Sequence, residues 1–455
     1  MQRLLKFLLV SMALNMVIST AVAQSNRWRD MHKVKKKETL YSISRDYGIT
    51  VEELIQANPE MASPDYKLKK GTTVFIPFSK TQSTAATTAT QQNAQQSTPV
   101  VDVRNRAIRL GVMLPLHDVD GDGKRMVEYY RGVLMACDSL KRQGISVDVY
   151  AWNTPKECNM KTVLDDANAQ NCDIIIGPLY SGQVAALSEF VAQHGIMLVI
   201  PFSIEAPELY SNKNIFQIYQ NPNELNESTA RRFSEWFKDY HPVIVDCADA
   251  NSTKGAFTSL VRRNLEAKQI TYNLTSLSST DENFRKAFDP NKRNVVLLNT
   301  ARSSDMISLF GKLSAVTVAN PDIQVSTFGY TEWLMYASRH IENFYRYNVH
   351  IPSYFYTNQT APATDYLQNL YRRNFQQQMM QSLPRFAITG FDHAYFFLKG
   401  LNKYGKTFDG AAGRFGYPAV QTPLKFERLG LGGYQNRAYM FVRFKPDHAI
   451  DLINY

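Results

Sequence analysis

The sequence predicts an α/β protein with a small N-terminal module, a disordered linker and a larger region of two lobes, each built on a doubly wound parallel sheet. Three observations support this prediction. Residues 32–77 give strand, helix, helix and strand signals in close succession, residues 81–98 have low complexity, and strands alternate with helices along two series that begin at residues 108 and 243. Near-continuous apolar strands that alternate with helices are typical of parallel sheets covered on both faces.

The first 23 residues have the pattern of a cleavable signal peptide. Arg3 and Lys6 precede an apolar run over residues 7–18, and Ala21-Val22-Ala23 forms a small-x-small cleavage pattern. The run is shorter than the ~20 residues that a membrane-spanning helix needs, and no later window is apolar enough. We therefore expect an exported, periplasmic protein with no membrane span.

Composition limits the classes of function. A length of 455 residues suggests about three compact units. The formal net charge of +10 fits a solvated basic surface, or weak attraction to anionic wall polymers, and no basic-aromatic block indicates nucleic-acid binding. The four cysteines (Cys137, Cys158, Cys172 and Cys247) include no C-x-x-C pair, so neither a metal nor a redox site is indicated and their pairing stays open.

The N-terminal module occupies residues 31–78. Thr39 is a good N-cap residue for a first helix, Thr50 caps a second one, and Asn58-Pro59 ends it. A closing strand follows the Gly71 turn. The βααβ order is similar to that of the LysM module, which binds the N-acetylglucosamine backbone of peptidoglycan or chitin; the matching residues are Val34, Thr39, Leu40, Ile43, Tyr47, Gly48, Val51, Leu54, Asn58, Pro59, Gly71, Ile76 and Pro77.

This resemblance implies a sugar groove between the first strand-helix loop and the second helix-strand loop, at residues 36–40 and 58–67. The implied peptidoglycan contacts are Lys37, Thr39, Leu40, Asn58 and Pro59. Lys37-Glu38 stands where the family usually has Gly-Asp, so we expect the fold to be kept while the affinity stays open.

A linker separates this module from the rest of the chain. Every residue from Thr81 to Thr98 is Thr, Gln, Ser, Ala or Asn, a composition that cannot bury a core. We expect residues 79–104 to be disordered.

The larger region, residues 105–455, is similar to type I periplasmic binding proteins of the leucine/isoleucine/valine-receptor superfamily. The segments that carry the resemblance are residues 172–203 and the helix start at Phe391-Asp392-His393-Ala394-Tyr395. It implies lobe 1 at about 105–222 and 350–406, lobe 2 at about 223–349 and 407–455, and three hinge crossings. We expect the crossings near 221–224, 347–352 and 404–410, and a terminal hairpin of residues 424–428 and 437–444 in lobe 2.

Ligands of open α/β sheets bind beyond the carboxyl ends of the strands. On that ground and by resemblance, the expected cleft contacts are Ser181, Ser203, Glu205, Thr300, Glu332 and Tyr354. Ser181 could equally be a helix cap alone. Glu205 departs from amino-acid receptors, because a carboxylate there would repel the carboxylate of an amino acid. A ligand with an amine, a neutral ligand or an unused cleft therefore remain alternatives.

Most enzyme signatures are missing. The sequence lacks H-E-x-x-H, G-x-S-x-G and the phosphate-binding G-x-x-x-x-G-K, and we expect no catalysis and no cofactor. Asp118, Asp120 and Asp122 open a calcium-loop pattern, but Tyr129 stands where its closing Glu belongs, which favours a polar turn over a metal site.

Three functions are compatible with these observations. The first is a wall-associated binding protein that holds peptidoglycan through the LysM module and a small ligand or wall fragment in the cleft. The second is a regulator or scaffold that works with wall-synthesis proteins and uses the receptor fold without transport. The third is a substrate-binding protein of an amino-acid type ABC permease.

Overall fold

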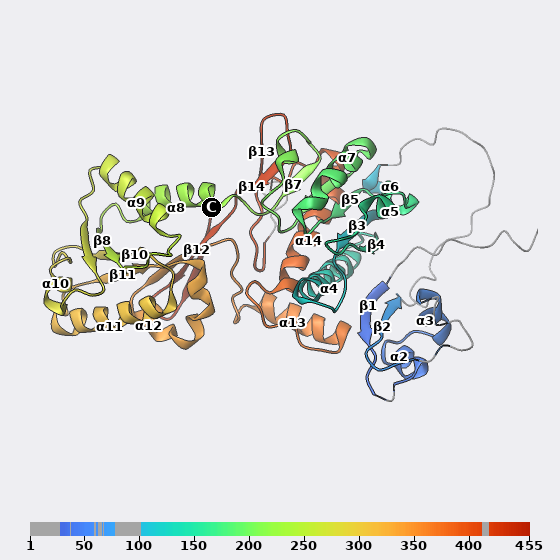
Figure 1. The fold of residues 1–455 in the computed structure, drawn as a ribbon, viewed down its shortest axis with the longest axis horizontal. Helices are drawn as coiled ribbons and strands as arrows, with labels where there is room; N and C mark the ends of the chain where they lie inside the picture. The colour runs from blue at the N-terminus through green and yellow to red at the C-terminus, as the bar shows by residue number, and fades with distance from the viewer. Residues whose placement is uncertain are drawn as a thin grey trace, which may run out of the picture.

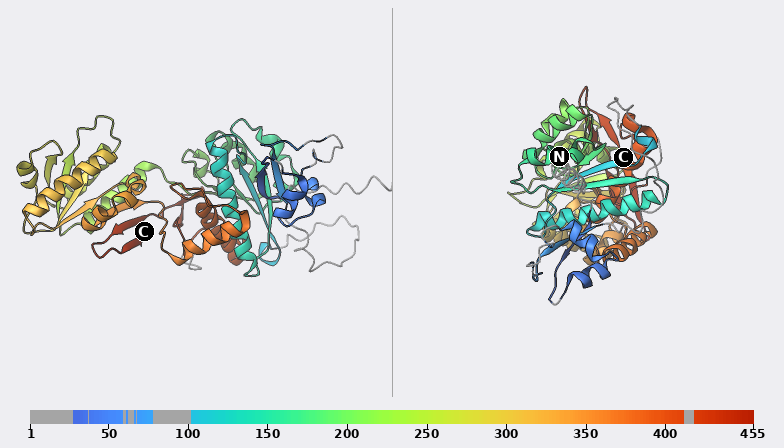
Figure 2. Two further views of the ribbon diagram at one scale, coloured as in Figure 1. Left: turned by 90° about the horizontal axis from the view of Figure 1, so that it is seen from below. Right: turned by 90° about the vertical axis from the view of Figure 1, so that its right-hand side faces the viewer.

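The structure is a computed structural model, and it describes residues 28–36, 38–58, 61, 66, 68–77, 102–411 and 418–455. The predicted signal peptide and residues 79–101 of the predicted linker lie outside these residues. The prediction of disorder is wrong for residues 102–104, because Asp102 caps a 3-10 turn (Val103–Asn105) whose Val103 is buried in the core of lobe 1. The described chain forms the N-terminal module and two lobes that lie one after the other along the long axis of the molecule (Figures 1 and 2). No helix within the described ranges is long and apolar enough to cross a membrane.

The N-terminal module has the predicted βααβ order. Its elements are β1 (Trp28–Lys33), α2 (Leu40–Asp46), α3 (Val51–Ala57) and β2 (Thr73–Pro77), and the two strands pair antiparallel. Thr39 and Thr50 each accept a hydrogen bond from the backbone N–H of the third helical residue, in two capping boxes. The buried apolar side chains are Val34, Ile43, Ile49, Leu54, Met61, Val74 and Ile76.

Lobe 1 has a seven-stranded sheet in the order β13-β14-β7-β6-β5-β3-β4. The strands are β3 (Ile108–Leu114), β4 (Val147–Asn153), β5 (Ile174–Ile176), β6 (Met197–Ile200), β7 (Ile215–Gln217), β13 (Phe426–Arg428) and β14 (Tyr434–Asn436). The helices are α4 (Gly121–Lys141), α5 (Met160–Leu164), α6 (Ala167–Gln170), α7 (Val184–His194), α13 (Pro362–Phe375) and α14 (Phe386–Tyr404). Only β13 is antiparallel to its neighbour, so most of the sheet is parallel, as predicted.

Lobe 2 has a second seven-stranded sheet, in the order β16-β15-β12-β11-β10-β8-β9. The strands are β8 (His241–Asp246), β9 (Asn273–Ser276), β10 (Asn294–Leu298), β11 (Val325–Phe328), β12 (Val349–Ser353), β15 (Met440–Phe444) and β16 (Ile450–Asn454). The helices are α8 (Pro222–Trp236), α9 (Gly255–Ala267), α10 (Asp281–Arg285), α11 (Ser303–Ala319) and α12 (Ile341–Arg346). β15 and β16 form an antiparallel hairpin at one edge of the sheet.

The chain crosses between the lobes three times, and two of the crossings differ from the prediction. The first lies between β7 and α8, at residues 218–221. The second lies between β12 and α13, at 354–361, and not near 347–352, because residues 349–353 form β12 in the sheet of lobe 2. The third lies between β14 and β15, at 437–439, and not near 404–410. The predicted hairpin of 424–428 with 437–444 is also wrong, because β13 pairs with β14 in lobe 1 while β15 joins lobe 2.

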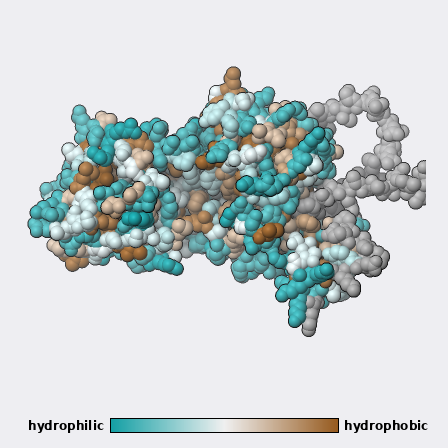
Figure 3. Space-filling model, viewed as in Figure 1, coloured by the Kyte–Doolittle hydropathy of each residue, from teal (hydrophilic) through white to brown (hydrophobic). Residues whose placement is uncertain are grey.

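This topology places the carboxyl ends of the parallel strands of both lobes on the side of the crossings. β7 and β12 each lead directly into a crossing, and the strands parallel to them end at the same edge of each sheet. The surface seen in Figure 3 mixes hydrophilic and apolar residues over both lobes. The loops that follow the strands of the two lobes are therefore the elements that can form a shared site.

Candidate functional site

The first loop of the N-terminal module is held by a compact set of hydrogen bonds. The Glu38 carboxylate accepts from the backbone N–H of Lys35 at 2.7 Å and lies 2.7 Å from Nε2 of His32. Nδ1 of His32 lies 3.1 Å from the Tyr47 hydroxyl. Although burial opposes it, these hydrogen bonds lower the pKa of Glu38. These contacts therefore fix the Lys35 backbone and the Glu38 side chain beside β1.

The predicted sugar contacts have different positions in the module. Thr39 is exposed and caps α2, and Leu40 is half-buried against the module core. Asn58 is fully buried: its amide donates to Leu54 O at 2.8 Å and Phe75 O at 2.7 Å, and its carbonyl accepts from Phe75 N–H at 2.8 Å. The Asn58 side chain thus joins α3 to β2 inside the module. Lys37 and Pro59 lie outside the described residues.

The module is docked on lobe 1, with its sheet turned toward α4 and α13 (Figure 1). Met31 and Phe75, which are paired across β1 and β2, pack against the hydrophobic core of lobe 1. Asp30, of which 2% is exposed, accepts from Nε of Arg131 on α4 at 2.9 Å. At the rim, Lys33 donates to Asp118 at 2.7 Å. Apolar packing and two ion pairs therefore connect the two parts.

Arg131 is the centre of a buried network behind this contact. Its Nη1 donates to the Tyr371 hydroxyl at 3.1 Å and lies 3.6 Å from Glu128, while Tyr371 donates to Glu128. Glu128 also accepts from the backbone N–H of Met380 at 2.7 Å. Burial raises the pKa of Asp30 although Arg131 opposes it, and the neighbouring Asp30 raises the pKa of Arg131 in spite of burial. The positive charge of Arg131 thus compensates the negative charges of two buried carboxylates, Asp30 and Glu128.

A cavity of about 430 Å³ lies between the module and lobe 1. Its lining includes His32, Lys33, Tyr47, His117, Lys124 and Gln377. The Asp118-Asp120-Asp122 turn stands beside it, and each carboxylate has a partner: Asp118 pairs with Lys33, Asp120 caps α4 through Gly123 N–H, and Asp122 pairs with Arg125. In the described part of the chain, no group of three His, Cys, Asp or Glu side chains is arranged to hold a metal ion.

On lobe 1, the predicted cleft residues occupy the loops after β5 and β6. Ser181 is exposed at the start of a short 3-10 turn (Ser181–Gln183) that precedes α7. The Ser203 hydroxyl accepts from Glu205 N–H at 3.2 Å, and the Glu205 side chain is exposed. Beside Ser181, the Tyr180 hydroxyl donates to Asp122 at 3.2 Å. Asp122 lies at the start of α4 and is paired with Arg125, so Glu205 is the carboxylate in these loops that disfavours an anionic ligand.

On lobe 2, the predicted cleft residues have partners within their own lobe. The Thr300 hydroxyl, which is buried, donates to Asp249 at 2.6 Å, and this hydrogen bond lowers the pKa of Asp249. Glu332 is exposed and forms an ion pair with Lys254 at 2.7 Å. A ligand would have to compete with these internal contacts.

Tyr354 lies at the second crossing and contacts the first. Its ring meets Tyr219 edge-to-face at 5.7 Å, and its hydroxyl is buried without a hydrogen-bond partner. Tyr219 stacks on Phe202 at 5.9 Å. Glu224, in the first turn of α8, forms an ion pair with Arg437 of the third crossing. Phe202 and Tyr219 were not predicted as site residues, because an aromatic residue in such a loop is more often expected to belong to the hydrophobic core.

All four cysteines are free. Burial raises the pKa of Cys137, Cys172 and Cys247 to about 12, and burial also raises the pKa of Cys158. A thiol with a raised pKa is a poor nucleophile and a poor metal ligand near neutral pH.

Comparison with known proteins supports both parts of the description. The LysM domain family matches residues 32–77. No curated protein sequence matches the chain. Among solved structures, a protein described as a branched-chain amino acid ABC transporter from Rhodospirillum rubrum aligns with 76% of this chain and 100% of its own, at 13% identity and a TM-score of 0.52.

Two further similar structures have lower TM-scores. LivJ, a branched-chain amino acid transporter substrate-binding protein from Streptococcus pneumoniae in complex with isoleucine, aligns over 77% of this chain and 100% of its own, with 12% identity and a TM-score of 0.39. LpoA from Haemophilus influenzae aligns over 78% of this chain and 60% of its own, with 13% identity and a TM-score of 0.46. The chain thus combines a LysM domain at residues 32–77 with a bilobal fold of the type I periplasmic binding protein kind.

Proposed function

We propose that this is a non-catalytic periplasmic protein that binds peptidoglycan through its LysM domain and a small ligand or wall fragment between its lobes. The LysM match at residues 32–77 carries the first half of the proposal. The second half is supported by the fold, in which the loops at the carboxyl ends of both sheets lie beside the crossings.

The docked position of the LysM domain changes how wall binding would act. If Asp30, Met31 and Phe75 remain on lobe 1, a glycan strand held by the module fixes the orientation of lobe 1. Lobe 1 would then be held in a fixed orientation at the wall, and lobe 2 would be the part that can move relative to it. This arrangement suits a protein that binds a small ligand or wall fragment between its lobes while it is held at the wall surface.

A second candidate, a regulator or scaffold of wall synthesis, is favoured by one observation. Thr300 forms a hydrogen bond with Asp249, and Glu332 forms an ion pair with Lys254. Because these partners belong to lobe 2 itself, the two polar side chains need no ligand as a partner. The role of an amino-acid receptor for an ABC permease is less favoured, because the exposed Glu205 would repel the ligand's carboxylate.

Sedimentation with purified sacculi tests the wall-binding half. We expect the full chain to co-sediment and a soluble N-acetylglucosamine tetramer to release it. Lys36→Glu, a charge reversal in the exposed first loop, should weaken binding, while Arg45→Glu on α2 makes the same charge change away from that loop. A chain that stays in the supernatant, or equal effects of both variants, would contradict the assignment.

A thermal-shift screen of amino acids, amino sugars and muropeptides tests the cleft. We expect a ligand with an amine to raise the melting temperature, and Glu205→Gln to reduce that shift. Glu189→Gln, an exposed carboxylate on α7, is the control. Stabilisation by leucine that Glu205→Gln leaves unchanged would instead favour the receptor role.

A further inference from the structure

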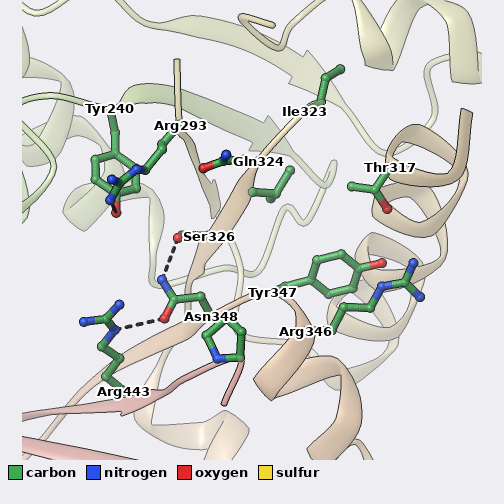
Figure 4. A pocket seen from close by; sticks show the side chains of 12 residues that line it. Tyr240, Arg293, Thr317, Ile323, Gln324, Ser326, Arg346, Tyr347, Asn348 and Arg443 are labelled. Carbon is green, nitrogen blue, oxygen red and sulfur yellow. Dashed lines mark hydrogen bonds between the residues drawn. The ribbon is translucent and has the colours of Figure 1, made fainter. Parts of the chain in front are cut away.

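Lobe 2 carries a basic pocket at the edge of its sheet that faces away from the crossings. Tyr240 and Arg293 directly precede β8 and β10, and Asn348 directly precedes β12. Arg443 of β15 lies opposite His350 at the same edge. The cavity has a volume of about 400 Å³ (Figure 4), and it shares no lining residue with the cavity at the LysM contact.

Three arginines line this pocket, and none of its lining residues is acidic. Arg293, Arg346 and Arg443 form no ion pair with any carboxylate in the described ranges. Arg293 lies over the ring of Tyr240 at 5.8 Å, and Arg346 lies over the ring of Tyr347 at 5.5 Å. Arginine stays charged at all relevant pH values, so the pocket concentrates positive charge that the protein itself does not compensate.

The pocket is also built to orient these groups. Nε of Arg443 donates to Oδ1 of Asn348 at 2.9 Å, and the Asn348 amide donates to the Ser326 hydroxyl at 2.9 Å (Figure 4). This relay uses Nε of Arg443 and leaves its two Nη groups to bind something else. Asn348 holds a positive φ of 41°, a conformation that costs free energy in a residue other than glycine.

A buried polar group supplies an independent sign of a ligand. Tyr347 is 2% exposed and lines the pocket, yet its hydroxyl has no hydrogen-bond partner. Its ring is fixed by stacking on Phe310 at 5.7 Å. A buried hydroxyl without a partner is costly, and a ligand acceptor in the pocket would satisfy it.

We propose that this pocket binds an anion with at least two phosphate or carboxylate groups, one held by Arg293 and Arg443 and the other by Arg346 with the Tyr347 hydroxyl donating to it. Guanidinium groups bind both kinds of oxyanion in a bidentate manner. Arg293 and Tyr240 lie on the same side of the pocket as Arg443, across from Arg346 and the Tyr347 hydroxyl, so a ligand with two anionic groups can reach more than one guanidinium (Figure 4). The site lies apart from the cleft, and its occupancy does not depend on the function proposed for the cleft or for the LysM domain.

Calorimetric titration of the full chain with pyrophosphate and with citrate at low ionic strength tests the proposal. We expect at least one of them to bind, and Arg346→Ala or Arg443→Ala to weaken that binding about 10-fold or more. Arg443→Lys should keep only part of the affinity, because lysine cannot bind in a bidentate manner. Arg262→Ala is the matched control, since Arg262 also lies over a tyrosine of lobe 2, at 5.6 Å from Tyr272, but outside the pocket.

Tyr347→Phe separates binding from folding. It removes a hydroxyl that has no partner in the protein, so the melting temperature should not fall, while the affinity for the anion should decrease about 3-fold or more. Flotation with phosphatidylglycerol vesicles, compared with phosphatidylcholine vesicles, distinguishes a lipid headgroup from a soluble anion as the natural source. The proposal is overturned if neither pyrophosphate nor citrate binds, or if Arg262→Ala weakens binding as much as the pocket variants.

Discussion

Arg131 is the residue on which the contact between the LysM domain and lobe 1 depends most. It is the cationic partner of Asp30 and also lies near Glu128, and all three side chains are largely buried. Arg131→Ala would leave two carboxylates buried without a compensating charge, which typically costs about 3–5 kcal/mol. We expect the variant to lower the midpoint of thermal unfolding by several degrees, as measured by calorimetry.

The control for Arg131 lies on the same helix. Arg125→Ala removes an exposed arginine whose partner, Asp122, is also exposed to solvent. Surface ion pairs of this kind contribute about 0–1 kcal/mol, so its unfolding midpoint should stay close to that of the parent. Similar effects of the two substitutions would show that the buried network contributes nothing beyond a surface pair.

Two buried histidines make the fold sensitive to acid. Burial lowers the pKa of His393 in lobe 1 to about 3, and burial together with the neighbouring Arg443 lowers the pKa of His350 in lobe 2 to about 3. Because the unfolded pKa is near 6.5, the unfolded chain takes up protons first, so stability present above about pH 6.5 is lost as the pH falls toward 3.

The expected loss is about 5 kcal/mol per histidine at the acid limit, since each pKa unit corresponds to about 1.4 kcal/mol. Denaturant unfolding between pH 7 and pH 4 should show about 3 kcal/mol of that loss. His393→Asn should flatten the dependence of lobe 1 on pH, although it loses the contact with the Tyr129 hydroxyl at 2.9 Å. A variant that remains as sensitive to acid as the parent would contradict this assignment.

At the scale of elements, lobe 1 depends on the close approach of α4 and α14. A Cβ atom on Gly132 would lie 1.8 Å from Ala387 O, and one on Gly390 would lie 2.0 Å from Tyr129 O. Gly132→Ala therefore forces the two helices apart, and we expect it to destabilise lobe 1 by about 3 kcal/mol in urea unfolding.

Gly311→Ala in α11 is the matched substitution, because a Cβ atom there meets nothing within 4 Å. In an open helical position, alanine should stabilise lobe 2 by about 0.5–1 kcal/mol. If Gly132→Ala and Gly311→Ala changed stability in the same direction, the close contact between α4 and α14 would not be the reason why position 132 requires glycine.

The elements that were predicted correctly are those whose signal is local. β3 begins at residue 108, where the first series of strands is predicted to start, because a strand buried on both faces has an unbroken run of apolar residues. The third crossing was misplaced, because the turn around Gly405 and Gly410 resembles a lobe boundary, whereas the true crossing at 437–439 has neither Gly nor Pro. That crossing is fixed instead by partners far away in the chain, such as Glu224 for Arg437.

The same reason explains which site residues could not be predicted. Capping by Thr39 and Thr50 follows from neighbouring residues and was predicted. The pairs Asp30–Arg131 and Thr300–Asp249 join residues that are 101 and 51 positions apart, so no local sequence pattern predicts them. The pocket of Arg293, Arg346 and Arg443 likewise appears only when the amino ends of the strands come together.

At the scale of the whole molecule, the question is whether the LysM domain stays on lobe 1 without the connecting chain. A specific protease site inserted at residue 90, outside the described residues, allows the connection to be cut after folding. Met31 and Phe75 pack on the lobe 1 core, and Asp30 is almost fully buried in the contact. We therefore expect the two fragments to elute together in gel filtration after cleavage, at micromolar concentration.

Met31→Asp, which places a charge in the apolar part of the contact, should let the two fragments separate, whereas Arg45→Glu on the outer helix α2 should not. Elution of the parent as two separate fragments would mean that the LysM domain is a free tether, and that wall binding leaves the orientation of lobe 1 unconstrained.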